Sequence, residues 1–130
     1  MRPARILAIL WTLLMLGLHA IPRTQLRGLP GKELTEVEGP DKLVHVLLFA
    51  LFGILWMWDS RERRWTILVA GLAYAIALEI MQSIAVAGRS GSVSDFVSDA
   101  VGLILALVAM VALATWKARV AIKSGLDAPH

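Results

Sequence analysis

Long apolar runs separated by short polar segments dominate this chain. The runs lie at residues 6–21, 43–58, 66–87 and 96–116. A helix that spans a bilayer needs about 20 apolar residues, with about 17 to 25 tolerated. The pattern therefore predicts an all-α membrane protein with four transmembrane helices. Their expected bounds are about 5–21, 42–58, 65–87 and 94–116, followed by a basic cytoplasmic tail at 117–130. One alternative for this tail is a helix that continues along the lipid surface.

Composition leaves little room for anything else. The chain has 130 residues, of which 58% are hydrophobic, and its mean hydropathy is +0.70. Four spans use most of that length, so residues 1–130 are expected to form a single membrane domain. Most basic residues flank the apolar runs, which argues against nucleic-acid binding despite the net charge of +3. The chain has no cysteine, which excludes disulfides, thiolate catalysis and Cys-ligated metals.

The first apolar run follows Arg2 and Arg5 and has two interpretations, a signal peptide or a retained helix. The candidate cleavage site is Leu18-His19-Ala20, where a small residue is expected in place of Leu18. We therefore expect this run to be retained as the first helix.

The basic residues predict the orientation. Eight lie in the N-terminus, the loop 59–64 and the tail, and five lie in the first and third loops. The positive-inside rule puts the eight in the cytoplasm, so both termini are expected there. Four tryptophans lie at the same predicted cytoplasmic ends, as an aromatic belt would: Trp56, Trp58, Trp65 and Trp116.

Polar residues interrupt the last three runs in one half of the membrane. A charge in a spanning helix costs roughly 2.5 to 3.5 kcal/mol on insertion scales, so such residues are site candidates. At 1.5 Å per residue, Glu79 lies about 12 Å below the outer end of its helix. The predicted topology puts all the candidates on the outer side: Asp41, Lys42, His45, Glu79, Gln82, Arg89, Asp95 and Asp99. Helices two to four are thus expected to form an outward-facing polar pocket.

Helical spacing supports convergence of these side chains. Asp41 and His45 are four apart, Glu79 and Gln82 three apart, and Asp95 and Asp99 four apart, so each pair shares a helix face.

Small residues predict close packing around the pocket. Gly102 would let a neighbouring helix approach and cover Asp99. Pairs four apart predict close packing of the third and fourth helices: Gly71 and Ala75, Ala73 and Ala77, and Gly102 and Ala106. The loop 88–92 is short and offers backbone N–H groups to an anion.

Structural roles compete with functional ones at several positions. Glu79 is expected either to pair with Arg89 or to act in a site, and Asp95 lies three residues after Ser92, as in a capping box. His45 is expected to be hydrogen-bonded rather than to ligate metal, because no His-rich spacing is present. No metal site and no cofactor are predicted. The excess of acidic residues in the cluster would need neutralisation by a cation or by a carboxyl that keeps its proton, so occupation by a divalent cation stays open. Serine catalysis is disfavoured, because no Gly-x-Ser-x-Gly motif occurs.

Two elements resemble the VanZ-like family of small bacterial membrane proteins. The first is Asp41-Lys42-Leu43-Val44-His45, and the second is Glu79-Ile80-Met81-Gln82 followed by Arg89, Asp95, Asp99 and Gly102. The chain departs from the family pattern at Val46, where an aromatic residue is common, and at Asp99, where asparagine is usual. The resemblance implies a multi-pass protein of the bacterial inner membrane, linked to the cell envelope and to low-level glycopeptide (teicoplanin) resistance.

Two functions from different classes remain open. In the first, the outward pocket binds a polar or phosphorylated lipid-linked group or a glycopeptide antibiotic. Arg89 and Lys42 would hold an anionic group, and the acidic residues would orient it. In the second, the protein is a membrane-embedded enzyme that modifies a lipid or cell-wall precursor by carboxylate acid–base chemistry. The expected partners are membrane lipids with either a lipid-linked cell-wall precursor or an antibiotic. Oligomeric state stays open.

Overall fold

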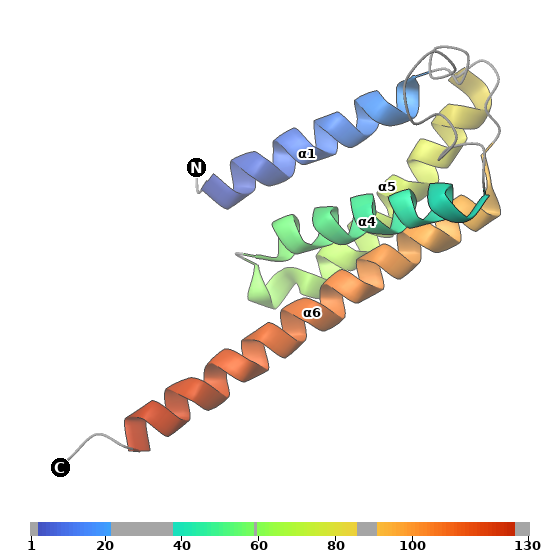
Figure 1. Cartoon of the computed structure of the whole chain (residues 1–130). Coiled ribbons are helices and arrows are strands. Elements are labelled where there is room, and N and C mark those ends of the chain that lie inside the picture. The colour runs from blue at the N-terminus through green and yellow to red at the C-terminus, as the bar shows by residue number, and fades with distance from the viewer. Residues whose placement is uncertain (1–2, 22–37, 59, 86–90, 127–130) are drawn as a thin grey trace.

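The computed structural model is all-helical over the residues it describes, 3–21, 38–58, 60–85 and 91–126. This part of the chain forms four α-helices and one short 3-10 helix (Figure 1). In chain order they are α1 (Pro3–Ala20), α4 (Glu38–Met57), η1 (Arg61–Arg63), α5 (Arg64–Ala85) and α6 (Val93–Leu126). The predicted all-α class is confirmed, with helices at the four expected places.

Proline and apolar composition explain where the helices run. Pro3 begins α1 and Pro40 lies in the first turn of α4. Proline is tolerated there because the first N–H groups of a helix have no partner within it. Three stretches are long and apolar enough to cross a membrane: Pro3–Ala20, Arg61–Ala85 and Val93–Lys123. Membrane spanning by α4 stays a prediction.

The last helix is longer than the predicted membrane span. The span was expected to end at about residue 116, with a basic tail for which continued helix was one alternative. α6 continues without a break to Leu126, so the tail is helical as far as that residue (Figure 1). The 34 residues of α6 measure about 51 Å, against about 30 Å for the hydrocarbon core of a bilayer. The C-terminal turns of α6 therefore extend beyond the hydrocarbon.

The closest helix packing joins α4 to α6 through small residues. A Cβ added at Gly102 would collide with the carbonyl oxygen of Val46 and lie 2.9 Å from the backbone N of Ala50. A Cβ at Gly53 would lie 2.6 Å from Cβ of Ala106. The predicted approach at Gly102 is thus confirmed. The partner of Gly102 and Ala106 is α4 rather than α5, and Ala73 and Ala77 are exposed.

Hydrogen bonds join α1 to α4 and α5. The indole N–H of Trp11 donates to the carbonyl of Leu48 at 3.1 Å. The Tyr74 hydroxyl donates to the carbonyl of Thr12 at 2.9 Å, and the Trp56 indole donates to the Thr12 hydroxyl at 3.1 Å. Trp56 is therefore a packing residue as much as a member of an aromatic belt.

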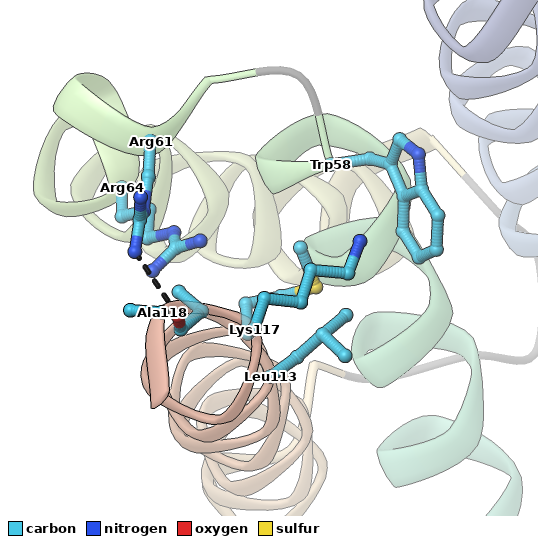
Figure 2. Close-up of a pocket in the computed structure, with 8 residues that line it drawn as sticks. Trp58, Arg61, Arg64, Leu113, Lys117 and Ala118 are labelled. Atoms are coloured by element: carbon cyan, nitrogen blue, oxygen red, sulfur yellow. Dashed lines mark hydrogen bonds between the residues drawn. The ribbon is translucent and has the colours of Figure 1, made fainter. Parts of the chain in front are cut away.

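Basic and aromatic residues gather at the end of the bundle where α4 ends and α5 begins. They line a pocket of about 490 Å³ that includes Trp58, Arg61, Arg64 and Lys117 (Figure 2). The Lys117 ammonium lies 5.9 Å from the centre of the Trp58 ring, and Arg61 donates to the carbonyl of Ala114 at 3.2 Å. Such residues are typical of a membrane–water interface. The acidic residues of the sequence pattern lie at the opposite end.

Candidate functional site

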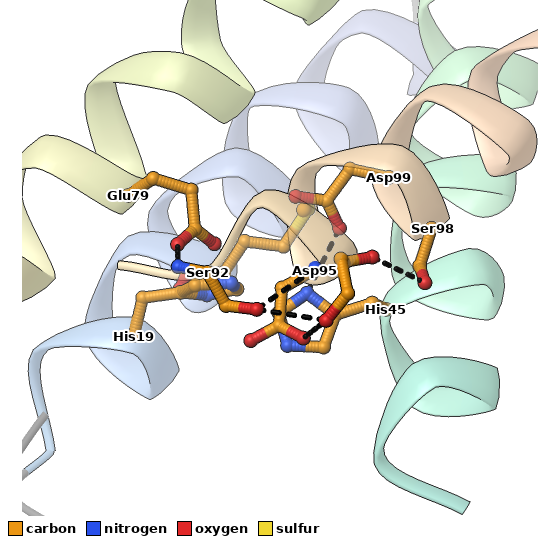
Figure 3. Close-up of polar contacts among 9 residues, drawn as sticks. His19, His45, Glu79, Ser92, Asp95, Ser98 and Asp99 are labelled. Atoms are coloured by element: carbon orange, nitrogen blue, oxygen red, sulfur yellow. Dashed lines mark hydrogen bonds and ion pairs between the residues drawn. The ribbon is translucent and has the colours of Figure 1, made fainter. Parts of the chain in front are cut away.

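Buried polar side chains from all four α-helices meet near the N-terminus of α6 (Figure 3). Their exposed fractions are small: His19 3%, His45 8%, Glu79 9%, Gln82 3% and Asp99 0%. Burial of polar groups costs free energy unless they find partners, so the contacts of each group matter.

The central contact joins α4 to α6. Nδ1 of His45 lies 2.9 Å from Oδ1 of Asp99, a residue 54 positions away in sequence. The prediction that His45 is hydrogen-bonded is therefore confirmed. Its carboxylate partner is Asp99 rather than Asp41, which shares its helix face. Burial of Asp99 follows from the close packing of α4 on Gly102, one turn along α6.

Glu79 accepts a hydrogen bond from the start of α6. The backbone N–H of Ser92 donates to Oε2 of Glu79 at 2.6 Å. Next to it, the N–H of Gly91 donates to the Ser83 hydroxyl at 2.8 Å. The carboxylate of Glu79 thus lies at a helix N-terminus, where the aligned peptide dipoles favour negative charge. Arg89, which was the expected partner of Glu79, lies outside the described residues.

Only half of the expected capping box forms at the start of α6. The Ser92 hydroxyl accepts from the N–H of Asp95 at 3.4 Å, as an N-cap does. The reciprocal bond would need the N–H of Ser92, which Glu79 occupies. The Asp95 carboxylate therefore makes a 3.5 Å contact with the Ser94 hydroxyl instead.

Three buried polar atoms of this cluster have no hydrogen-bond partner among the described residues. They are Oε1 of Glu79, Nε2 of Gln82 and Oδ2 of Asp99. An unsatisfied buried group costs about 1 to 3 kcal/mol, and native structures leave few of them. These atoms are therefore candidates for contact with a ligand.

An apolar groove runs past Glu79 between α5 and α6. Its volume is about 420 Å³. The walls are Ile76, Ile80 and Ile84 of α5 with Val93 and Phe96 of α6, and Glu79, Ser83, Gly91 and Ser92 complete the lining. Since the three isoleucines are exposed on the bundle surface, the groove opens toward the position that lipid would take.

The remaining predicted residues lie around this core. Ligand atoms of Asp41, His45 and Asp95 lie within 4.8 Å of one another, and the same holds for His45, Glu79 and Asp99. Lys42 is half-buried on α4 next to Asp41. The structure thus brings together Asp41, His45, Glu79, Asp95 and Asp99, while Arg89 falls outside the described residues.

Sequence reasoning missed two contributors. His19 of α1 is buried, and its ring packs edge-on against the His45 ring at 5.5 Å between centroids. We considered it only as part of a cleavage site, although a histidine in an apolar run was itself a signal. The second is the Ser92 backbone N–H, which no side-chain pattern reveals.

The comparisons agree with the pattern of motif residues. The family model described as VanZ/LLP1 matches residues 6–114. The match covers α4, α5 and most of α6, including every residue of the cluster. No curated protein and no solved structure gives a significant match. The chain belongs to the VanZ/LLP1 family.

Proposed function

We propose that this VanZ/LLP1 protein binds the polar or phosphorylated head of a lipid-linked molecule at the outer face of the bacterial inner membrane. The topology in this proposal has four membrane-spanning helices with both termini in the cytoplasm. The observation that carries it is the placement of partnerless buried polar atoms beside an apolar groove. Glu79 belongs to both features.

The groove suits an acyl or prenyl chain. Its isoleucine and phenylalanine walls offer dispersion contacts and no charge, while Glu79 and Ser92 lie where a chain would meet its head group. A head-group hydroxyl or amine donor would satisfy Oε1 of Glu79. A lipid could then enter sideways from the bilayer without exposing its chain to water.

Positive charge for an anionic head would come from Lys42 and Arg89. Lys42 lies on α4 beside Asp41. Arg89 lies outside the described residues and enters this proposal from the sequence alone. In this proposal, binding accounts for any role in glycopeptide resistance, because the bound molecule would be a cell-wall precursor or the antibiotic itself.

A matched pair of substitutions tests binding. Purified protein is titrated with a long-chain prenyl phosphate in detergent, and bound lipid is counted by native mass spectrometry. Glu79→Gln keeps the shape of the side chain but replaces one carboxylate oxygen, Oε1 or Oε2, with an NH2 group and removes the negative charge. We expect it to weaken binding at least tenfold. Glu62→Gln makes the same change on the exposed η1 helix and should bind as the unaltered chain does. Equal binding by both variants would contradict the proposal.

One observation favours an enzyme as the second candidate. A histidine hydrogen-bonded to a buried carboxylate is the arrangement that orients an imidazole as a general base. The protein would then turn over a lipid or cell-wall precursor. Release of head group or phosphate by the purified protein, lost in His45→Gln while lipid still binds, would establish catalysis. Binding without any turnover would exclude it for that lipid.

A further inference from the structure

Three potential metal ligands approach one another from three different helices. His45 of α4, Glu79 of α5 and Asp99 of α6 each offer a nitrogen or oxygen atom, and these atoms all lie within 4.8 Å of one another (Figure 3). The residues are 34 and 20 positions apart along the chain, so tertiary packing alone brings them together. Local helix spacing cannot explain the grouping.

Two of the three side chains hold an oxygen that nothing in the described structure satisfies. Oδ2 of Asp99 and Oε1 of Glu79 have no hydrogen-bond partner, although Asp99 is fully buried and Glu79 is 9% exposed. If these residues served only helix packing, apolar side chains would fill the space without the free-energy cost of burying carboxylates. A cation would satisfy buried carboxylate oxygens that no hydrogen-bond donor reaches.

We propose that His45, Glu79 and Asp99 bind one divalent transition-metal cation, with Zn²⁺ or Mn²⁺ the best matches. One imidazole with two carboxylates is a mixed nitrogen–oxygen set that suits these ions better than Ca²⁺ or Mg²⁺, which prefer oxygen ligands. Zinc bonds of about 2.0 to 2.2 Å at tetrahedral angles place neighbouring ligand atoms roughly 3.3 Å apart. His45 Nδ1 and Asp99 Oδ1 are now joined by a hydrogen bond of 2.9 Å, so a cation would replace the shared proton and the two atoms would separate slightly.

A cation here would also reduce the repulsion between the acidic site and an anionic lipid head. This step of the argument rests on the proposed function. Four carboxylates surround the site, from Asp41, Glu79, Asp95 and Asp99, and they would repel a phosphate. Three protein ligands leave coordination positions open, as in zinc sites that accept an exogenous ligand. A phosphate oxygen could take one of them. The site therefore favours an anionic lipid head that arrives next to the cation.

A second arrangement of ligands competes with this one. Asp41, His45 and Asp95 also bring ligand atoms within 4.8 Å of one another. Asp41 and Asp95 are only half-buried, and neither carries a buried oxygen without a partner. Hydration can satisfy them. We therefore assign the cation to His45, Glu79 and Asp99, because only the latter two carboxylates hold a buried oxygen without a partner in the described structure. Substitution of Asp95 distinguishes the two arrangements.

Direct metal binding tests the proposal without any lipid. The full chain is purified in detergent, stripped with a chelator and dialysed against Zn²⁺ or Mn²⁺, and bound metal is measured by mass spectrometry. We expect one ion per chain. Asp99→Asn and Glu79→Gln should each weaken binding at least about tenfold, and Asp95→Asn should weaken it clearly less. Glu62→Gln, on the exposed η1 helix, should bind the metal as the unaltered chain does.

Thermal unfolding shows that the variants are folded. Added Mn²⁺ should raise the melting temperature of the unaltered chain and leave that of Asp99→Asn unchanged, because a ligand stabilises only the state that binds it. Should Asp99→Asn fail to fold, Glu79→Gln carries the test. No bound metal in the unaltered chain, or an equal loss in Asp95→Asn, would overturn the site. Lipid binding without metal would overturn this inference and leave the proposed function standing.

Discussion

Replacing Gly102 with alanine should separate α4 from α6 and so disturb the polar cluster. The added Cβ would collide with the carbonyl oxygen of Val46 and lie 2.9 Å from the backbone N of Ala50 and 3.1 Å from Cβ of Phe49. Two of these three contacts are with the α4 backbone, which cannot rotate out of the way as a side chain can. The helices must therefore move apart at the position where Asp99 meets His45.

The size of the effect follows from two opposing terms. Overpacking a close contact costs about 1 to 3 kcal/mol, and contact with backbone puts this case at the upper end. Alanine in place of glycine returns about 1 kcal/mol through helix propensity. Gly102→Ala should therefore lower the free energy of unfolding by about 1 to 2 kcal/mol.

The same substitution in α1 provides the control. A Cβ at Gly17 meets no atom within 4 Å, so Gly17→Ala should stabilise the helix by about 0.5 to 1 kcal/mol. Denaturation in detergent, followed by circular dichroism, measures both variants. If Gly102→Ala is as stable as Gly17→Ala, α4 does not lie on α6 as described, and the burial of Asp99 loses its explanation.

Three further predictions concern the His45–Asp99 pair, the packing of α1 and the membrane topology. His45→Ala should cost about 3 to 5 kcal/mol, as breaking a buried pair does, and His45→Ala combined with Asp99→Ala should cost less than the sum in a double-mutant cycle. Trp56→Phe should lower the melting temperature through a loss of about 1 kcal/mol, because it removes the donor to α1. In this cysteine-free chain, an impermeant thiol reagent applied to whole cells should label Ser94→Cys and leave Ser60→Cys unlabelled until the membrane is opened. Labelling of Ser60→Cys first would reverse the topology.

Much of the architecture follows from the lengths of the apolar runs and from the positions of proline. Apolar runs of 16 to 22 residues place the helices, and proline in the first turn marks the start of α4. The end of α6 is different, because lysine and arginine are good helix formers and no proline occurs between Trp116 and Leu126. A change from apolar to basic composition predicts where lipid ends. It does not predict where a helix ends.

Convergence of the polar residues was also predictable, but their pairing was not. Spacing shows that Asp41 and His45 share a face, yet the rotation of α4 against α6 decides that His45 bonds to Asp99. Close packing at Gly102 was predicted from the sequence, but the helix that packs there, α4 rather than α5, is seen only in the three-dimensional structure. The Glu79 contact involves a backbone N–H of Ser92 and has no signature in side-chain patterns.

The central claim, that a lipid-linked head group sits beside Glu79 with its chain between α5 and α6, is tested most directly by mapping a photoreactive prenyl phosphate. The probe is bound in detergent, activated by light and located by peptide mass spectrometry. We predict labels on the groove residues of α5 and α6, centred on Ile80 and Phe96, that an excess of unlabelled prenyl phosphate removes. Labels spread evenly over the exposed faces of all four helices, unaffected by competitor, would contradict the account.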